Sequence, residues 1–255
     1  MLSSLGVLFY FIKKDFKSKY VGSFLGVVWA VLVPVTQIVI FWFVFDEILK
    51  SRPYATTNVP YIYFLLSTIL MWIGFSESIT RASFSVLEHC DMIKKVSFPN
   101  VYLPIAYTVS NYVQPLLGFF VFLVFYSVAT GFSPAFLLTI PVIGLQMIFT
   151  MGVAMVLSAI MPYVRDTVYL IGNAMQGLFF LSPIMYSLEK IPAKYRVLFY
   201  INPFAYFASA YHDIVLIRTV PKVSVLIILL LITGLSFAGG LYVFTKLKDG
   251  FSDIL

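Results

Sequence analysis

Long apolar runs recur along the chain, and the segments between them hold most of the charged and turn-forming residues. A transmembrane helix needs about 20 apolar residues to cross roughly 30 Å of hydrocarbon. Six runs meet this length, so the pattern predicts an all-α integral membrane protein with about six transmembrane helices. The predicted spans are residues 24–45, 61–80, 103–129, 136–161, 167–187 and 223–244.

The segment before the first span has the periodicity of an amphipathic helix. Within residues 4–20, Leu5, Leu8, Phe9, Ile12 and Phe16 fall on one side and Lys14 and Lys17 on the other. Such a helix lies in the membrane surface rather than across the bilayer. We therefore expect residues 1–23 to form an interface segment.

The connection over residues 83–98 also carries an amphipathic pattern. Val86, Cys90, Ile93 and Val96 share one helical face, and Glu88, Asp91 and Lys95 share the other. A short amphipathic helix outside the spans has to rest on something. From the pattern alone, the bilayer surface and a partner protein are both open.

A second connection, residues 189–222, is longer than most structureless loops. It is rich in apolar and aromatic residues and is broken at Pro192, Pro203 and Pro221. We expect two short helices that dip into one leaflet, because non-helical backbone at membrane depth must be shielded by protein or water. The whole of 1–255 then forms a single transmembrane domain.

Composition supports the membrane assignment. Hydrophobic residues make up 61% of the chain and charged residues 11%, which leaves too little polar surface for a soluble globule. The net charge of +6 comes from residues at the ends of apolar runs, where they anchor helices, and not from an aromatic-interleaved patch for nucleic acid.

Basic residues also predict the topology. With both termini inside, the inner connections hold Lys13, Lys14, Lys17, Lys19, Arg81, Lys94, Lys95, Arg165, Lys246 and Lys248, and the outer ones hold Lys50, Arg52, Lys190, Lys194, Arg196, Arg218 and Lys222. Most of the outer set sits in one long connection, where charge has less influence on topology. We therefore expect both termini in the cytoplasm.

The sequence contains little that points to catalysis. No G-x-x-x-x-G-K-[ST] motif is present to bind nucleotide phosphates, so any ATP would be bound by another chain. His89 and His212 lie in connections on opposite sides of the membrane and fit no metal-ligand spacing. We expect no enzyme activity, no metal site and no cofactor in this chain.

Polar residues inside the spans have two interpretations. Tyr169, Asn173, Gln176 and Phe180 share one helical face, and Tyr107, Asn111 and Gln114 share another. Such side chains either hold helices together or line a polar path. Glu77 and Arg81, four residues apart, are expected to form a structural pair.

Three separated stretches resemble the permease subunits of ABC type-2 exporters for lipid-linked O-antigen, capsule and teichoic acid. They are KSKYVGSFLGVVWAVLVP at 17–34, MIKKVSFPNVYLP at 92–104, and SPIMY, IPAKYR and INPF within 182–204. The YVRD turn at 163–166 is also similar.

The resemblance implies a homodimer with two copies of an ATP-binding subunit, which would hold ATP and magnesium. The substrate would be a polysaccharide on undecaprenyl diphosphate, crossing the bacterial inner membrane between the two copies. Related alternatives are a capsule or teichoic acid exporter and an exporter of small amphiphiles; a membrane-bound lipid or sugar enzyme is a further alternative.

Roles for individual residues follow from this resemblance. A coupling helix that receives force from the ATPase would use Val86, Glu88, Cys90, Asp91, Ile93, Lys94, Lys95 and Phe98, and an outer gate would use Pro183, Tyr186, Pro192, Tyr195, Asn202 and Pro203. We place the substrate path at Trp29, Thr36, Gln37, Tyr169, Asn173, Gln176 and Phe180. Lys13, Lys14 and Lys17 would guide the lipid headgroup.

Overall fold

The structure is a computed structural model that describes residues 4–50, 59–96, 98–188 and 191–251. Every regular element within these ranges is a helix. Five helical segments among them are long and apolar enough to cross a bilayer. The predicted all-α membrane fold is therefore confirmed. Arg52 and Lys190, which were counted for the topology, lie outside the described residues.

The five long segments match five of the predicted spans within a few residues. They are Gly26–Ile48, Tyr61–Ser83, Tyr102–Thr130, Pro134–Ile160 and Val223–Gly250. Their α-helical parts are α2 (Trp29–Trp42), α3 (Tyr61–Ser83), α5 (Tyr102–Thr130), α6 (Thr139–Ile160) and α10 (Val223–Leu247). The short helices η1 (Gly26–Val28), η2 (Phe43–Ile48), η4 (Pro134–Leu138) and η8 (Lys248–Gly250) extend them.

The remaining predicted span, residues 167–187, is helical only in its first part. Helix α7 (Thr167–Phe180) has 14 residues, which reach about 21 Å at 1.5 Å per residue. Pro183 has no backbone donor and disfavours helical geometry at Ser182. The chain therefore leaves the helix, and the side-chain amide of Asn202 donates to the carbonyls of Leu178 and Leu181 near its end.

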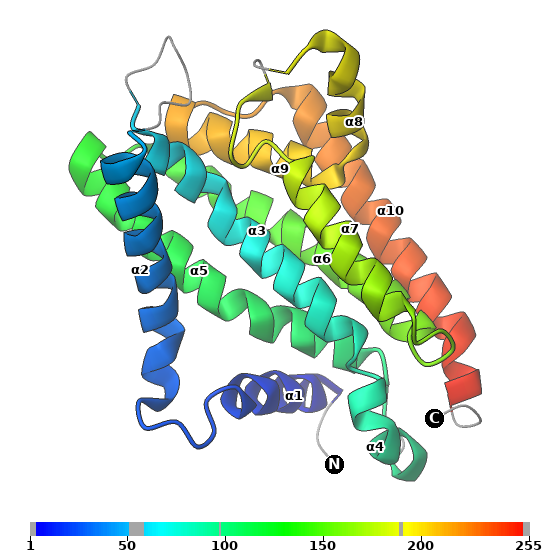
Figure 1. Cartoon of the computed structure of the whole chain (residues 1–255). Helices are drawn as coiled ribbons and strands as arrows, with labels where there is room; N and C mark the ends of the chain where they lie inside the picture. The colour runs from blue at the N-terminus through cyan, green and yellow to red at the C-terminus, as the bar shows by residue number, and fades with distance from the viewer. Residues whose placement is uncertain (1–3, 51–58, 97, 189–190, 252–255) are drawn as a thin grey trace.

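Both chain termini lie at one end of the bundle, which we call the terminal end; the opposite end is the far end (Figure 1). Helix α1 (Ser4–Ser18) runs across the terminal end, and the short helices η3 (Leu87–His89) and α4 (Cys90–Lys95) lie beside it. At the far end are η6 (Ala193–Tyr195), α8 (Arg196–Ile201) and η7 (Asp213–Ile217).

Helix α1 is apolar on more than one side. Phe11 is buried and packs with Leu103 of α5 and Phe98, while Leu5 and Phe9 are exposed on the single chain. The periodicity of the sequence assigned Leu5 and Phe9 to the apolar face of this helix, but it did not assign Phe11 to that face. One side of α1 therefore binds the protein, and the exposed apolar residues are free to contact lipid.

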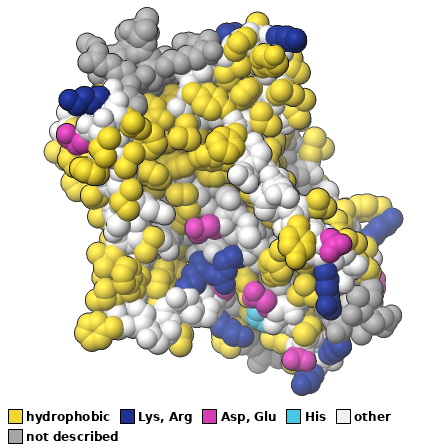
Figure 2. Space-filling view, viewed as in Figure 1, with side chains coloured by type: hydrophobic (Ala, Val, Ile, Leu, Met, Phe, Trp, Pro, Cys, Tyr) yellow, Lys and Arg dark blue, Asp and Glu magenta, His cyan; other side chains and the backbone are white. Residues whose placement is uncertain are grey.

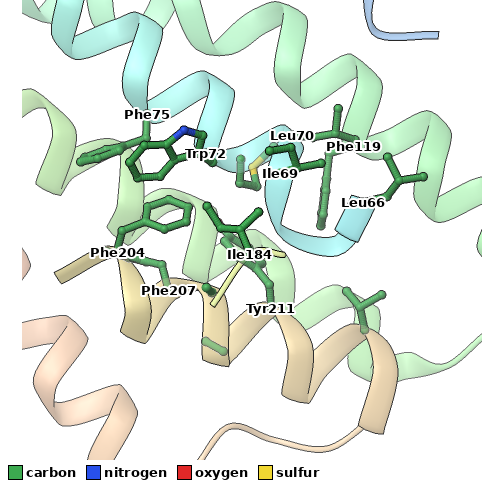
Figure 3. Close-up of a cluster of buried hydrophobic side chains, with 14 of the residues drawn as sticks. Leu66, Ile69, Leu70, Trp72, Phe75, Phe119, Ile184, Phe204, Phe207 and Tyr211 are labelled. Carbon is green, nitrogen blue, oxygen red and sulfur yellow. The ribbon is translucent and has the colours of Figure 1, made fainter. Parts of the chain in front are cut away.

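Helix α3 forms the centre of the bundle and packs against α5, α6 and α9 (Pro203–His212). Of its apolar stretch, 78% is buried, against 11% for the first span. Figure 3 shows Trp72 and Phe75 of α3 facing Phe204 and Phe207 of α9. The ring centroids of Trp72 and Phe204 are 4.8 Å apart, edge to face. A short helix, α9, is thus built into the core of the bundle.

Candidate functional site

Two helices leave polar and aromatic side chains uncovered at membrane depth. On α7, Asn173 and Gln176 are exposed, together with Tyr169 at 73% and Phe180 at 58%. The only residues of α7 that are buried are Thr167 and Ile171. The predicted path residues of α7 therefore all lie on an open face, which we call the α7 face.

The predicted path residues of the first span also lie near its surface. Trp29 is 41% exposed, Thr36 is exposed and Gln37 is half-buried. The Thr36 hydroxyl donates to the Leu32 carbonyl at 2.8 Å, inside its own helix. Helix α2 packs on α5 and α3, while α7 packs on α3. Figure 1 draws α3 between α2 and α7, so the path residues of these two helices lie apart within one chain.

A group of polar contacts, which we call the polar junction, joins α1, α3, α5 and η3 at the terminal end. Arg81 of α3 forms an ion pair with Asp15 of α1, with 3.1 Å between Nη2 and Oδ1. The predicted pairing of Arg81 with Glu77 is wrong, since a partner from α1 takes the guanidinium instead. Asp15 is 5% exposed, so α1 carries its charge into the protein and needs the cation of α3 there.

The segment after α1 is tied to α5 by three further polar contacts, one of them from Lys19 Nζ to the Ser110 carbonyl at 3.3 Å. Lys19 Nζ donates to Asn111 Oδ1 at 2.8 Å, and the Tyr20 hydroxyl donates to Gln114 Oε1 at 3.2 Å. Burial lowers the pKa of Lys19 to about 8; the carboxylate of Asp15 opposes the shift and Arg81 adds to it. In this span the amides Asn111 and Gln114 hold elements together.

Tyr107 of α5 connects this junction to the predicted coupling segment. Its hydroxyl donates to Glu88 Oε2 at 2.5 Å, the Arg81 guanidinium lies 5.6 Å from its ring centroid, and the ring of His89 packs edge-on against it at 5.9 Å. His89 also packs edge-on against Phe11 of α1. A displacement of this segment would therefore reach α3 and α5 through Tyr107 and α1 through His89.

The predicted coupling residues divide into an inner and an outer group. Val86 is buried beside Met155 and Phe244, and Cys90, Ile93 and Phe98 are half-buried. Glu88, Asp91, Lys94 and Lys95 are exposed. Lys13, Lys14 and Lys17 on α1 are exposed as well. Figure 2 shows dark blue and magenta side chains gathered at the lower part of the molecule, below a largely yellow surface.

Of the predicted gate residues, Pro183, Tyr186 and Asn202 lie around the end of α7. Asn202, only 2% exposed, caps α9 by accepting from the Phe204 backbone N–H at 3.0 Å, and its amide donates to Ser182 Oγ at 2.7 Å. Tyr186 donates to the Phe180 carbonyl and packs edge-on against Phe199. Pro183 is buried, Pro203 is half-buried, and Pro192 and Tyr195 are exposed.

Sequence reasoning missed a buried polar cluster in the middle of the bundle. Gln146 of α6 donates to the Met71 carbonyl and to the Tyr112 hydroxyl, both at 2.9 Å, and accepts from Tyr211 of α9 at 2.7 Å. The Tyr112 hydroxyl also bonds Thr150 Oγ1 at 2.9 Å. The available signal was a lone amide inside an apolar run, which hydrocarbon leaves without water.

No group of three or more His, Cys, Asp or Glu side chains that could hold a metal ion occurs among the described residues. The described residues instead offer exposed amides and aromatic rings on two separate faces, and the polar junction at the terminal end. A model of the ABC-2 type transporter family matches residues 7–216. The chain belongs to the ABC-2 type transporter family.

Similar proteins of this family match along the whole chain. An O-antigen export system permease protein RfbA from Klebsiella pneumoniae is 30% identical over 268 residues, covering 100% of this chain and 98% of that protein. A second from the same organism is 28% identical with the same coverage. An RfbA from Myxococcus xanthus is 25% identical over 97% of this chain and 95% of its own length. As an ABC-2 family member, the chain is a multi-pass membrane transport protein.

Proposed function

We propose that this chain is the permease of an ATP-driven exporter that moves an undecaprenyl-diphosphate-linked polysaccharide across the bacterial inner membrane. Two copies would assemble with two ATP-binding subunits, which would supply ATP and magnesium. The family supports an ABC transport role, and the names of the relatives support O-antigen as the type of cargo. The observation that carries the proposal is the pair of uncovered polar faces, on α2 and α7, that flank α3 in one chain.

An uncovered amide at membrane depth is costly unless water or another protein group satisfies it. The α7 face and the exposed side of α2 are kept apart within one chain by α3, on which both helices pack. In a two-fold dimer each copy offers its α2 to the α7 of the other. Such a dimer encloses a polar path with two equivalent walls.

The side chains of these walls suit a sugar polymer. Tyr169, Phe180 and Trp29 offer aromatic faces to the apolar C–H faces of sugar rings, while Asn173 and Gln176 exchange hydrogen bonds with hydroxyls. Each contact is weak and replaceable. Transport needs this property, since a site that binds too tightly would stop movement along the path.

The terminal end is the cytoplasmic side in this proposal. Its exposed charges on the coupling segment, Glu88, Asp91, Lys94 and Lys95, would contact the ATP-binding subunit. Closure of that subunit would push on the coupling segment and move α3 and α5 through Tyr107 and α1 through His89. Lys13, Lys14 and Lys17 would attract the diphosphate of the lipid carrier to the same side.

Cross-linking between copies tests the path. In a Cys90→Ala background, Thr36→Cys combined with Gln176→Cys should give a disulfide-linked dimer in oxidised membranes. Leu230→Cys, exposed on α10 outside both faces, serves as the matched control and should stay monomeric on denaturing gels. Equal cross-linking of the control, or none for the pair, would contradict the α2–α7 interface.

Labelling of the natural Cys90 tests the orientation. The terminal end is proposed to face the cytoplasm, so a membrane-impermeant maleimide should label Cys90 in inside-out vesicles and not in intact cells. If intact cells were labelled instead, an ATP-binding subunit could not reach the coupling segment and the exporter mechanism would be excluded.

A further inference from the structure

An apolar groove of about 700 Å³ runs along the outside of the bundle between α5 and α6. On α5 its wall is one continuous helical face, formed by Leu116, Phe119, Phe120, Leu123, Val124, Ser127 and Val128. The other wall comes from Phe132, Phe136 and Leu137 and from Thr139, Ile140 and Ile143 at the start of α6. Ser127 and Thr139 are its only polar side chains, and the Thr139 hydroxyl donates to the Phe136 carbonyl.

The groove has the dimensions of one leaflet. From Leu116 to Val128 the helix rises about 18 Å at 1.5 Å per residue, and half of a 30 Å hydrocarbon core is about 15 Å. The groove occupies the half of α5 toward the far end, where α5 finishes at Thr130. Phe120, Val128 and Ile140 are each more than half exposed on the single chain. An extended acyl chain therefore fits it in length and in polarity.

A basic side chain, that of Arg218, lies where the groove meets the far end of the bundle. Arg218 Nη2 donates to the carbonyl of Thr130, the last residue of α5, at 2.8 Å. Its guanidinium lies 5.8 Å from the ring centroid of Phe136, a groove residue, and 5.9 Å from that of Tyr126. No carboxylate of the described residues lies within ion-pair distance of it.

The backbone at Arg218 is in an uncommon conformation for a residue with a side chain. Its φ of 61° lies in the left-handed region, which glycine adopts more readily. This turn ends η7 and directs the guanidinium back to the end of α5. A guanidinium carries five N–H donors, and the Thr130 carbonyl takes a hydrogen bond from one of its nitrogens.

We propose that this groove binds one phospholipid with an anionic headgroup, its acyl chain along α5 and its phosphate at Arg218. The inference depends on the chain being embedded in a bilayer and not on the proposed cargo. Arginine suits phosphate oxygens because its planar fork offers two parallel hydrogen bonds. The lipid would be bound at the far end, away from the α7 face.

The test is lipid retention by the full chain. The protein is reconstituted in vesicles of phosphatidylethanolamine and phosphatidylglycerol, extracted in mild detergent and analysed by native mass spectrometry. The wild type should retain phosphatidylglycerol in excess over its share of the vesicle lipid. Arg218→Gln should lower that retention by about tenfold, as expected for loss of a charge-assisted hydrogen bond. Arg218→Lys, which keeps the charge, should fall between them.

A second variant tests the groove without touching the cation. Val124→Trp places a large ring in the groove and should lower retention of both lipids, whereas Leu230→Trp on exposed α10 should not. Lys222→Gln removes a charge at the same end and should leave retention unchanged. Wild-type retention in Arg218→Gln or in Val124→Trp would overturn the proposal. So would a change of oligomeric state in Val124→Trp, which would make the groove a contact between copies.

Discussion

Helices α7 and α9 are both short, both carry polar residues and both lie at membrane depth. Their polar groups differ, because those around α9 form hydrogen bonds inside the chain and those on α7 face outward. Around α9, Tyr211 bonds Gln146 and the capping residue Asn202 bonds the end of α7. On α7, Tyr169, Asn173 and Gln176 face outward from the single chain. Polar groups satisfied inside the chain fix its fold, while those left open are available to a second copy, water or cargo.

The largest expected effect is a difference in protein stability between substitutions of two asparagines, Asn202 and Asn173. Asn202→Ala removes the amide that donates to the carbonyls of Leu178 and Leu181 and also removes the cap of α9, and should lower the free energy of unfolding by about 2–4 kcal/mol. Asn173→Ala, on the open α7 face, should change it by less than about 0.5 kcal/mol. Thermal unfolding in detergent measures both. Equal losses would remove the distinction between the two helices.

The second effect concerns transport, for which the open α7 face should be important although it contributes little to stability. Asn173→Leu with Gln176→Leu makes the α7 face apolar, and surface polysaccharide should fall by about fivefold or more, since each lost hydrogen bond is worth about 1 kcal/mol. Immunoblotting of the cell surface measures this at matched protein levels. Leu170→Ile, on the same helix with its apolar character kept, is the control. Intact export in the double variant would mean that the α7 face does not line the path.

The third effect tests whether Tyr107 transmits movement or only packs. Tyr107→Phe removes the hydrogen bond to Glu88 but keeps the ring beside Arg81 and His89, so stability should fall by only about 1 kcal/mol. In a reconstituted complex we expect ATP hydrolysis to continue while export per ATP falls. Glu88→Gln, which still accepts a hydrogen bond, should retain more coupling. Unchanged export per ATP in Tyr107→Phe would reduce this residue to a structural role.

A fourth effect is a pH dependence of stability at Lys19. Its folded pKa of about 8 lies below the ordinary 10.5, so between these values the unfolded chain binds more protons than the folded one. The stability of the wild type should therefore rise with pH across that window relative to Lys19→Gln, and the difference should be flat below about pH 8. Unfolding of both proteins over this range measures it. A difference that stays constant above pH 8 would show that Lys19 is not desolvated.

Much of this fold could be predicted from the sequence because apolar runs of fixed length have few alternatives in a bilayer. Five spans were predicted in this way, and the interface helix followed from its periodicity. The early end of α7 was missed, since Ser182–Pro183 is a weak stop until Asn202, about twenty residues later, supplies the donor for the freed carbonyls. Contacts distant in sequence decide such boundaries.

The same limit applies to the side chains. Periodicity identified the open face of α7, because exposure of a helix face is a local property. It did not identify the partners of Arg81 and Gln146, which come from α1 and from α3, α5 and α9. Helical periodicity predicts which residues share a face, but not which other helix packs against that face. The assignments that depend on another helix therefore needed the structure.

Helices α6 and α10 meet backbone to backbone at two glycines. A Cβ added at Gly240 would lie 2.3 Å from the carbonyl oxygen of Gly152, and one added at Gly152 would lie 2.4 Å from the Ser236 carbonyl. Ser236 also donates to the Phe149 carbonyl at 3.0 Å. At these two glycines there is no room for a side chain between the helices, so sliding one helix along the other would bring backbone atoms into collision. We therefore expect the two helices to move as one unit, and conformational freedom during a working cycle to come from other parts of the bundle.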